Sequence, residues 1–456
     1  MMSGMGEREV DVVVIGAGAP GEVIAGRLGE AGLRVAIVEE RLVGGECSFY
    51  ACMPSKALLR PGELEAEARR VPGVPTGELD VDAVLARRDE VVHDLDDSTQ
   101  LPWLEDRGVV LVRGHGRLDG ERRVVVDDDV LVARRAVVVA TGSSATIPPV
   151  QGLAEARPWT NVEATTAKHV PGRLFVLGGG VVGVEMAQAW SSLGSRVTLV
   201  HRDARLIERE EPFASEQVAT ALREAGVDVR LETSVAAVSR NGAVRVALVG
   251  GGEVEADEIL VSIGRTPRTT DIGLESVGLE PGKHVRVDES LRVPGHEGWL
   301  YAVGDVNGRA LLTHMGKYQA RLAADAILGK DVRLRSDGGA SPGVIFTDPQ
   351  VGSVGLTLAA AQEAGLDVRA VDVETSGNAG GSFVGRNAPG TARLVVDEKR
   401  RVVVGATITG AEVAEALHAA TIAVIGEVPL DDLWHAVPSF PTRSELWLRL
   451  LEAYGL

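Results

Sequence analysis

The sequence predicts an α/β protein that contains two similar βαβ units and ends in a separate α+β region. In the first unit, a β-branched run at residues 11–15 precedes a glycine-rich turn, a helix-like stretch and an apolar run at residues 33–39. The same order of elements recurs between residues 174 and 201. A strand, a glycine turn, a helix and a second parallel strand form a right-handed βαβ unit. Strand-like alternation and helical periodicity then indicate the α+β region.

Further segments complete this organisation. Residues 137–142 and 259–264 have the pattern of buried parallel strands that end in a small residue. Residues 61–104 are charged and helix-prone, and predict a helical excursion on the surface. The glycine- and serine-rich residues 336–342 predict a linker. After the linker, the pattern predicts two strands and two helices, at residues 392–397, 402–404, 411–425 and 444–453.

Composition narrows the classes of partner. The chain has 456 residues, and 47 basic against 65 acidic side chains give a formal charge of −18. This balance argues against nucleic acid and against an anionic membrane surface as partners. The chain contains no apolar run of eighteen residues, so we expect a cytoplasmic protein without a membrane span. Glycine is frequent, at 55 residues, which is typical of tight turns and of backbone that approaches a ligand closely.

Each βαβ unit carries the glycine spacing GxGxxG after a strand and at the start of a helix. The glycines are Gly16, Gly18 and Gly21 in the first unit and Gly178, Gly180 and Gly183 in the second. Such glycines let the backbone approach a pyrophosphate, which then lies at the helix N-terminus. In the first unit, Glu39 lies about twenty residues further on and can accept hydrogen bonds from a ribose diol. The alternative for Glu39 is a solvated acid at a strand end.

The corresponding position in the second unit is basic. His201 ends the second strand and is followed by Arg202 and Arg205. An imidazole and two guanidiniums suit a 2′-phosphate, so the second site is expected to bind NADPH in preference to NADH. Surface charges beside an NADH site are the alternative, and NADH use stays possible.

The two cysteines form the most specific signal. Cys47 and Cys52 lie five residues apart in the segment 44–56, GGECSFYACMPSK, near a helix start that can lower a thiol pKa. In a cytosolic protein, such a pair is more often redox-active than structural. No metal is expected, because zinc needs four ligands and no histidine pair with ligand spacing lies nearby. Buried, inert cysteines are the alternative. Phe49 and Tyr50 between them are expected to pack, or to form a stacking surface for a flat electron acceptor.

At these residues the chain resembles the class I pyridine nucleotide-disulfide oxidoreductases, which include glutathione reductase, dihydrolipoamide dehydrogenase and mercuric reductase. Four further segments resemble motifs of the family: residues 137–142, 263–267, 301–305 and 345–352. The resemblance implies FAD- and NAD(P)-binding domains of the Rossmann type and a C-terminal dimerisation domain. It implies FAD binding by residues 1–150 and 275–338, NAD(P)H binding by residues 151–274, and a homodimer interface in residues 339–456.

The family resemblance also implies roles for single residues. Cys47 would exchange with the substrate and Cys52 would face the flavin. Lys56 would lie beside the flavin and pair with Glu185, and Asp305 would bind the ribityl chain. The alternatives are a turn residue for Asp305 and an exposed helix acid for Glu185. Other glycines and a threonine would contact the cofactors: Gly45, Gly116, Thr141, Gly142 and Gly264.

One departure limits the resemblance. Many family members end in a run in which a histidine precedes Pro-Thr-x-Ser-Glu and acts as acid–base in the partner's active site. Phe440 occupies that position here, while Glu445 remains, and His435 could reach in from an upstream turn. A missing acid–base costs about 10²–10⁴-fold in proton transfer. An efficient dithiol–disulfide reductase is therefore expected to be handicapped here. The expected acceptor is a small-molecule disulfide or other thiol-reactive group whose reduction tolerates the loss of the histidine. Quinone or metal-ion reduction, dihydrolipoamide dehydrogenase activity and slow redox sensing are the alternatives.

Overall fold

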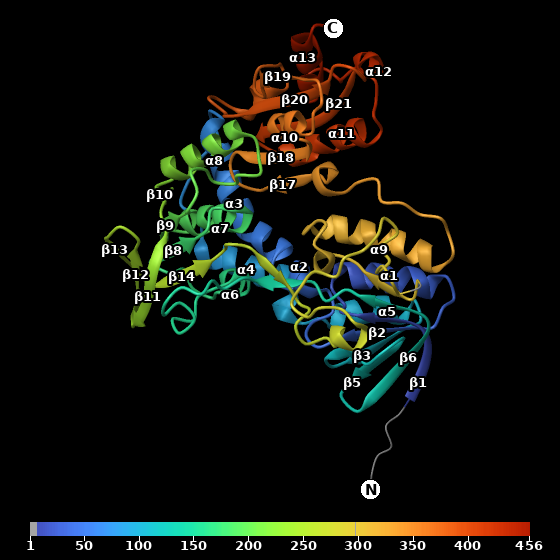
Figure 1. The fold of residues 1–456 in the computed structure, drawn as a ribbon. Helices are drawn as coiled ribbons and strands as arrows, with labels where there is room; N and C mark the ends of the chain where they lie inside the picture. Colours follow the sequence, from blue (N-terminus) through green and yellow to red (C-terminus); the bar gives the residue numbers. More distant parts are fainter. Residues whose placement is uncertain (1–6, 297) are drawn as a thin grey trace. The chain divides into compact units, whose positions relative to one another are not determined.

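The computed structural model describes residues 7–296 and 298–456, and the chain divides into two compact units, each assembled from three segments (Figure 1). The first unit consists of Met1–Pro54, Asp89–Ala145 and Arg265–Gly338. The second consists of Ser55–Arg88, Thr146–Gly264 and Gly339–Leu456. The predicted α/β class is confirmed in both units.

The first unit is organised around one mixed sheet with the strand order β3-β2-β1-β6-β5-β4, and β16 pairs with β6. Strands β1, β2, β3, β6 and β16 pair in parallel, while β4 and β5 pair antiparallel. The strands are β1 (Glu7–Ile15), β2 (Val35–Glu39), β3 (Val109–Arg113), β4 (Gly116–Leu118), β5 (Arg123–Val126), β6 (Asp129–Val139) and β16 (Leu300–Ala302). A separate pair joins β7 (Ser143–Ala145) to β15 (Arg265–Pro267).

Helices α1 (Ala19–Glu30) and α9 (Thr313–Ile327) pack against each other beside this sheet (Figure 1). Val12, Val13 and Val14 are fully buried in the centre of the sheet, as expected for a parallel strand covered on both faces. Shorter helical segments are α2 (Gly45–Phe49), α5 (Leu101–Glu105), η1 (His93–Leu95), η2 (Ser98–Gln100), η3 (Leu274–Val277) and η4 (Asp305–Asn307).

The second unit repeats the parallel arrangement on a smaller scale, in the order β10-β9-β8-β14. The strands are β8 (Arg173–Leu177), β9 (Arg196–Val200), β10 (Asp228–Arg230) and β14 (Glu258–Val261). An antiparallel meander follows β10: β11 (Val235–Asn241), β12 (Ala243–Leu248) and β13 (Glu253–Ala256). The helices of this part are α6 (Asn161–Thr166), α7 (Val181–Ser192) and α8 (Pro212–Glu224). The predicted second βαβ unit is thus present as β8-α7-β9.

The C-terminal part of the second unit is α+β, as predicted. Its antiparallel sheet has the order β17-β18-β21-β20-β19. The strands are β17 (Gly343–Ile345), β18 (Gln350–Gly355), β19 (Val368–Glu374), β20 (Thr391–Asp397) and β21 (Val402–Gly410). The helical segments are η5 (Gly338–Ala340), α10 (Leu358–Glu363), η6 (Gly381–Val384), α11 (Val413–Ile425), α12 (Leu430–His435) and α13 (Glu445–Tyr454). The predicted strands and helices of this region lie within six residues of these bounds.

The helical excursion differs from its prediction at its start. Helix α3 (Cys52–Arg70) already begins at the second cysteine, and Pro61 lies inside it, although an interior proline removes a backbone hydrogen bond. The excursion is also not confined to the surface. Leu58 and Leu59 of α3 and Leu85 of α4 (Val81–Val91) belong to the buried core of the second unit. Burial of these apolar side chains explains why the helix continues through the proline.

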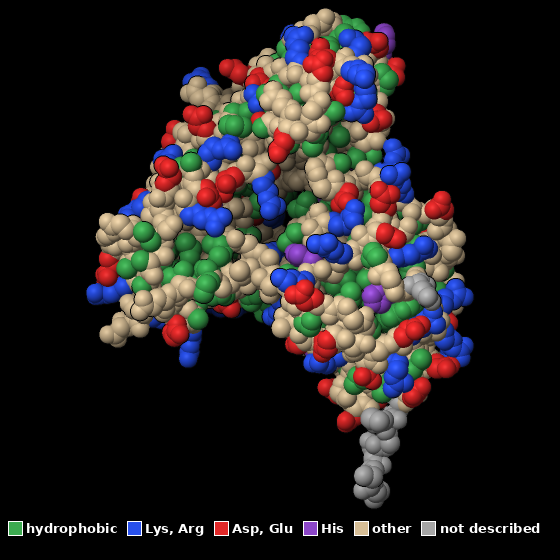
Figure 2. Space-filling model, viewed as in Figure 1, with side chains coloured by type: hydrophobic (Ala, Val, Ile, Leu, Met, Phe, Trp, Pro, Cys, Tyr) green, Lys and Arg blue, Asp and Glu red, His purple; other side chains and the backbone are tan. Residues whose placement is uncertain are grey.

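Charge is distributed without a single-sign patch on the visible face, where basic and acidic side chains are interspersed (Figure 2). Among the described residues, no helix is both long and apolar enough to span a membrane.

Candidate redox-active site

The first glycine turn leaves one side open at the start of α1. Gly16 has φ +103°, and a Cβ there would lie 2.5 Å from the carbonyl oxygen of Ala140. A Cβ on Gly21 would lie 2.0 Å from the carbonyl oxygen of Gly16. Gly18, which precedes α1, would meet nothing closer than 4.0 Å. The turn is therefore closed on its protein side and accessible at the helix N-terminus, which suits a pyrophosphate.

Glu39 ends β2 beside this turn. Its Oε2 accepts a hydrogen bond from the backbone N–H of Ala17 at 2.7 Å, and its Oε1 accepts one from Arg41 at 2.8 Å. Burial raises the pKa of this carboxyl, and the two backbone donors oppose that effect. The carboxylate is thus fixed by the turn itself, in an orientation from which it can accept further bonds from a ribose diol.

The two cysteines lie together in the first unit, and both are half-buried. Cys47 lies in α2, and Cys52 is the first residue of α3. A side-chain hydrogen bond with Cys52 and burial raise the pKa of Cys47, while Thr313 and the positive charge of Lys317 lower it. The Sγ of Cys52 lies 3.4 Å from Oγ1 of Thr313 at the start of α9. The pair can form a disulfide or bind a thiol-reactive group.

Next to the cysteines, Glu46 forms a charged network that the sequence analysis missed. Its Oε2 accepts from Arg265 at 2.5 Å, and its Oε1 accepts from Arg268 at 2.7 Å. Nε of Arg265 donates to Oγ of Ser143 at 2.6 Å, and Ser143 in turn donates to Oδ2 of Asp305 at 2.6 Å. In the sequence, Glu46 directly before Cys47 and Arg268 directly after Pro267 were the features that could have indicated this network.

Asp305 lies in η4 and is more than a turn residue. Burial raises the pKa of its carboxyl, and Ser143 and Arg265 oppose that shift. The predicted Thr141 is near the same network, because its Oγ1 donates to the backbone oxygen of Arg268 at 2.7 Å. An acceptor held in this way suits a hydroxylated chain such as the ribityl group of a flavin.

The second glycine turn has the same geometry at the start of α7. A Cβ on Gly183 would lie 1.9 Å from the carbonyl oxygen of Gly178, whereas Gly180 has no neighbour within 4 Å. His201 ends β9, and its Nδ1 accepts from the N–H of Gly179 at 3.1 Å. Its Nε2 lies 3.2 Å from Oε1 of Glu208.

Charged side chains of both signs lie near His201 at the end of the second strand. Arg202 is mostly exposed and bonds Asp203 at 3.0 Å, and Arg205 lies 3.5 Å from the backbone oxygen of Glu208. The sequence analysis overlooked Asp203 and Glu208, although both follow His201 closely enough in the chain to contact it. The site therefore combines two guanidiniums with two carboxylates.

Lys56 and Glu185 form an ion pair within the second unit. The Nζ of Lys56 lies 2.7 Å from Oε2 of Glu185, and Oε1 of Glu185 accepts from the N–H of Phe346 at 2.9 Å. Glu185 is only 3% exposed, so the alternative of an exposed helix acid is wrong. Nζ of Lys56 also lies over the ring of Phe346, 4.7 Å from its centroid.

The remaining predicted residues are glycines near the expected cofactor sites and the aromatic pair between the two cysteines. A Cβ on Gly45 would lie 2.7 Å from Cα of Gly18, so Gly45 adjoins the first turn. Gly116 packs under Val38, and Gly142 and Gly264 have positive φ and no atom near their missing Cβ. Phe49 is buried and packs, as the first of its two alternatives predicts. The guanidinium of Arg41 lies 5.0 Å from the ring centroid of Tyr50.

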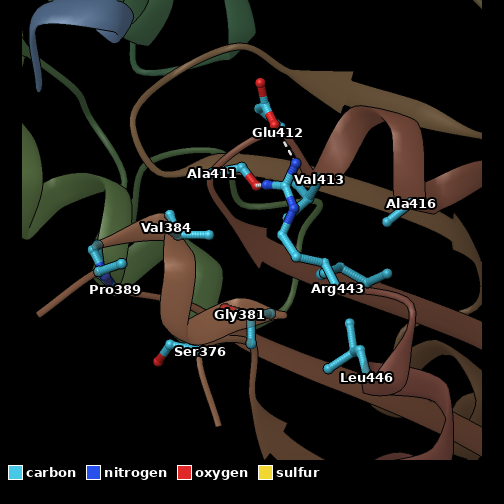
Figure 3. Close-up of a pocket in the computed structure, with 13 residues that line it drawn as sticks. Ser376, Gly381, Val384, Pro389, Ala411, Glu412, Val413, Ala416, Arg443 and Leu446 are labelled. Carbon is cyan, nitrogen blue, oxygen red and sulfur yellow. Dashed lines mark hydrogen bonds and ion pairs between the residues drawn. The ribbon is translucent and has the colours of Figure 1, made fainter. Parts of the chain in front are cut away.

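The C-terminal segment holds Phe440 in an exposed position, with 77% of its surface accessible, and His435 is also exposed. Glu445 is buried and accepts from the N–H of Gly380 at 3.2 Å. Arg443 donates to the backbone oxygen of Ala411 at 2.7 Å and pairs with Glu412 (Figure 3). These contacts border an apolar cavity of about 40 Å³. Glu445 and Arg443 therefore fix the segment that follows Phe440.

The geometry defines a class of protein: a dinucleotide-dependent oxidoreductase with a thiol pair beside the first nucleotide turn. Comparison with known proteins agrees with this class. Residues 10–325 match the model of the pyridine nucleotide-disulphide oxidoreductases, and residues 341–450 match the model of the dimerisation domain of the same proteins. The chain therefore belongs to the pyridine nucleotide-disulphide oxidoreductase family and is an FAD-dependent enzyme. The match of residues 341–450 supports a homodimer.

Several individual proteins are similar over nearly the whole chain. Mercuric reductase of Staphylococcus aureus is 30% identical over 96% of this chain and 81% of its own length. Dihydrolipoyl dehydrogenase of Chlamydia trachomatis is 31% identical over 96% of this chain and 95% of its own. Among solved structures, the HOCl-induced flavoprotein disulfide reductase RclA from Escherichia coli has a TM-score of 0.86 and 25% identity, covering 97% of this chain and 99% of that protein.

Proposed function

We propose that the protein passes electrons from NADPH through FAD to the Cys47–Cys52 disulfide, and from the resulting dithiol to a small-molecule disulfide or other thiol-reactive acceptor. The observation that carries this proposal is the hydrogen-bonded pair Cys47–Cys52 in the unit that also holds the first glycine turn. Bound FAD supplies the two-electron chemistry between nicotinamide and thiols, and the protein orients both. Residues 1–150 and 275–338 would hold FAD, residues 151–274 NADPH, and residues 339–456 the dimer interface.

Cys47 and Cys52 have different roles in the transfer of electrons from the dithiol to the acceptor. Two electrons and two protons convert the disulfide into the thiols of Cys47 and Cys52. The thiolate of Cys47 then attacks one sulfur of a disulfide acceptor, which breaks the acceptor S–S bond, releases the first thiolate and forms a mixed disulfide with Cys47. Cys52 attacks the Cys47 sulfur of this mixed disulfide, which releases the second thiolate and re-forms the intramolecular disulfide. Lys56, held by Glu185, would carry a positive charge toward the flavin. The first glycine turn, Glu39 and Asp305 provide the groups that fit FAD.

Two arginines support NADPH as the donor. Arg202 and Arg205 follow the second strand of the second βαβ unit, where a 2′-phosphate would lie, and guanidiniums bind phosphate in a bidentate manner. Asp203 and Glu208 reduce the net positive charge there. Comparing the KM values of NADPH and NADH tests the preference: a KM for NADPH that is lower by about tenfold supports it, and a lower KM for NADH contradicts it.

Phe440 favours a second candidate function, reduction of quinones or metal ions. Its exposed ring replaces the acid–base imidazole, and electron transfer to such acceptors does not depend on that proton transfer. The relatives that are named mercuric reductases make a metal ion a relevant acceptor to test. Phe440→His should raise disulfide reduction and leave quinone reduction unchanged. Unchanged disulfide reduction would mean that proton transfer does not limit the rate.

A substitution at the first cysteine separates the two functions. Cys47→Ser and wild type are assayed with NADPH against a disulfide and a quinone, with flavin content matched by absorbance. Loss of the disulfide activity by about 10³-fold or more is expected, because serine cannot form the mixed disulfide. Retention of that activity contradicts the proposal. Quinone reduction that survives in Cys47→Ser assigns the quinone activity to direct transfer from the flavin.

A further inference from the structure

Glu46 lies directly before Cys47 and is shared by two arginines. Each of its carboxylate oxygens accepts a hydrogen bond from a different guanidinium, Arg265 at 2.5 Å and Arg268 at 2.7 Å. The Glu46 side chain is 19% exposed, and the arginines are 22% and 29% exposed. Charge-assisted bonds of this kind, partly shielded from water, are stronger than neutral ones.

The same arginines are tied to the backbone at the edge of the β7–β15 pair. Arg265 and Arg268 both donate to the backbone oxygen of Ser143, at 2.9 and 3.1 Å. Through the hydroxyl of Ser143 the network continues to Asp305. Hydrogen bonds therefore connect helix α2, which carries Cys47, to the β7–β15 pair and to Asp305.

The network is balanced in charge. Glu46 and Asp305 contribute two negative charges, and Arg265 and Arg268 contribute two positive ones. Removing the charge of Glu46 would leave an excess positive charge on Arg265 and Arg268, the two arginines that hold the residue directly before Cys47. A nearby positive charge stabilises a thiolate and hence the reduced form of the pair.

We propose that Glu46 is a positioning residue that sets the reduction potential of the Cys47–Cys52 pair, by neutralising Arg265 and Arg268 and by fixing helix α2. This inference rests on the proposed cycling of Cys47 and Cys52 between disulfide and dithiol. The negative charge of Glu46 offsets the two arginines. The reduction potential of the pair is therefore lower, and the dithiol a stronger reductant, than it would be beside the arginines without Glu46.

The test compares variants that change the charge in opposite directions. In the FAD-loaded protein, the thiol–disulfide equilibrium is measured against glutathione redox buffers by thiol alkylation, for wild type, Glu46→Gln and Arg268→Gln. Glu46→Gln should favour the reduced pair by about tenfold, which is about 30 mV for two electrons. Arg268→Gln should shift the equilibrium in the opposite direction, and Glu46→Asp should restore it toward wild type. Glu9→Gln is the control: it removes an acid of β1 that is paired with Arg134 of β6, and it should leave the thiol–disulfide equilibrium unchanged.

The outcomes separate this inference from the proposed function. If the thiols of the wild-type protein never change with the redox buffer, the proposed function fails. If the wild-type thiols respond to the redox buffer but Glu46→Gln and Arg268→Gln have the same thiol–disulfide equilibrium as wild type, the role of Glu46 is overturned. It is also overturned if both variants shift that equilibrium in the same direction. The melting temperature of each variant is recorded, because a general loss of packing would not move the equilibrium in opposite directions.

Discussion

The two glycine turns have nearly the same backbone but different side chains at the end of the following strand. In both turns the last glycine would place a Cβ about 2 Å from the carbonyl oxygen of the first, at 2.0 Å for Gly21 and 1.9 Å for Gly183. The first turn faces Glu39, whose carboxylate is fixed by two backbone N–H groups. The second faces His201, which itself accepts from the turn and contacts a carboxylate. The shared backbone geometry makes both turns suited to a dinucleotide, and we expect the side chain at the strand end to select which dinucleotide each turn binds.

Among substitutions that probe the difference between the two turns, the largest effects are expected at the matched glycines. Gly21→Ala should yield protein with little bound FAD. Gly183→Ala should retain FAD but lose reduction by NADPH by about 10- to 100-fold, because forcing a methyl group into such a space costs about 1–3 kcal/mol. Flavin absorbance and stopped-flow reduction measure the two effects. Gly77→Ala, at a glycine with no atom near its Cβ position, is the control. Equal loss of flavin in both variants would contradict the division of roles.

A second difference concerns the acids near the start of the two helices. Glu185 of α7 is paired with Lys56, whereas burial raises the pKa of Glu22 in α1 to about 7, with Glu39 adding to the shift and Lys317 opposing it. Because the folded-state pKa is the higher one, this group contributes stability that is fully present below pH 4.5 and lost as the pH rises through about 7. The difference between the two pKa values corresponds to about 3 kcal/mol.

Urea unfolding between pH 5 and pH 8 measures this contribution. The wild-type free energy of unfolding should fall over that interval, and Glu22→Gln should flatten the decrease. Glu30→Gln, at the other end of α1, should follow wild type. A Glu22→Gln profile parallel to that of wild type would show that Glu22 does not titrate in this range.

The smallest effects are expected at the strand end of the second turn. Arg202→Ala should raise the KM for NADPH by about tenfold and leave that for NADH unchanged, since one charge-assisted hydrogen bond contributes about 1.5–3 kcal/mol. Glu208→Gln should lower the KM for NADPH by a smaller factor, because it removes a negative charge near the phosphate. Arg223→Ala, in α8, is the control. An equal change for both nucleotides would contradict a 2′-phosphate site.

Much of the fold could be predicted from local pattern. The two βαβ units, the linker and the C-terminal α+β region follow from β-branched runs, glycine spacing and helical periodicity, which act over short stretches of chain. The start of α3 could not be predicted in the same way. Pro61 argues against a helix interior, and only the tertiary burial of Leu58 and Leu59 overrides that preference.

The candidate site was predictable where residue type limits the chemistry, and less so where partners come from distant segments. The cysteine spacing and the family resemblance singled out Cys47, Cys52 and the pairing of Lys56 with Glu185, which the structure places in contact. The hydrogen bonds from Arg265 and Arg268 to Glu46 join residues more than 200 positions apart, so the sequence shows the charged residues but not their contact. The hydrogen bond that His201 accepts from the N–H of Gly179 likewise forms only in the folded turn.

The most direct measurement is an anaerobic titration of the FAD-loaded protein with NADPH, followed by flavin absorbance and by alkylation of thiols. The proposed electron path predicts that the first two electrons convert the Cys47–Cys52 disulfide into two titratable thiols, with a long-wavelength absorption band from the Cys52 thiolate beside an oxidised flavin. Bleaching of the flavin by those two electrons with no gain of thiols would contradict it.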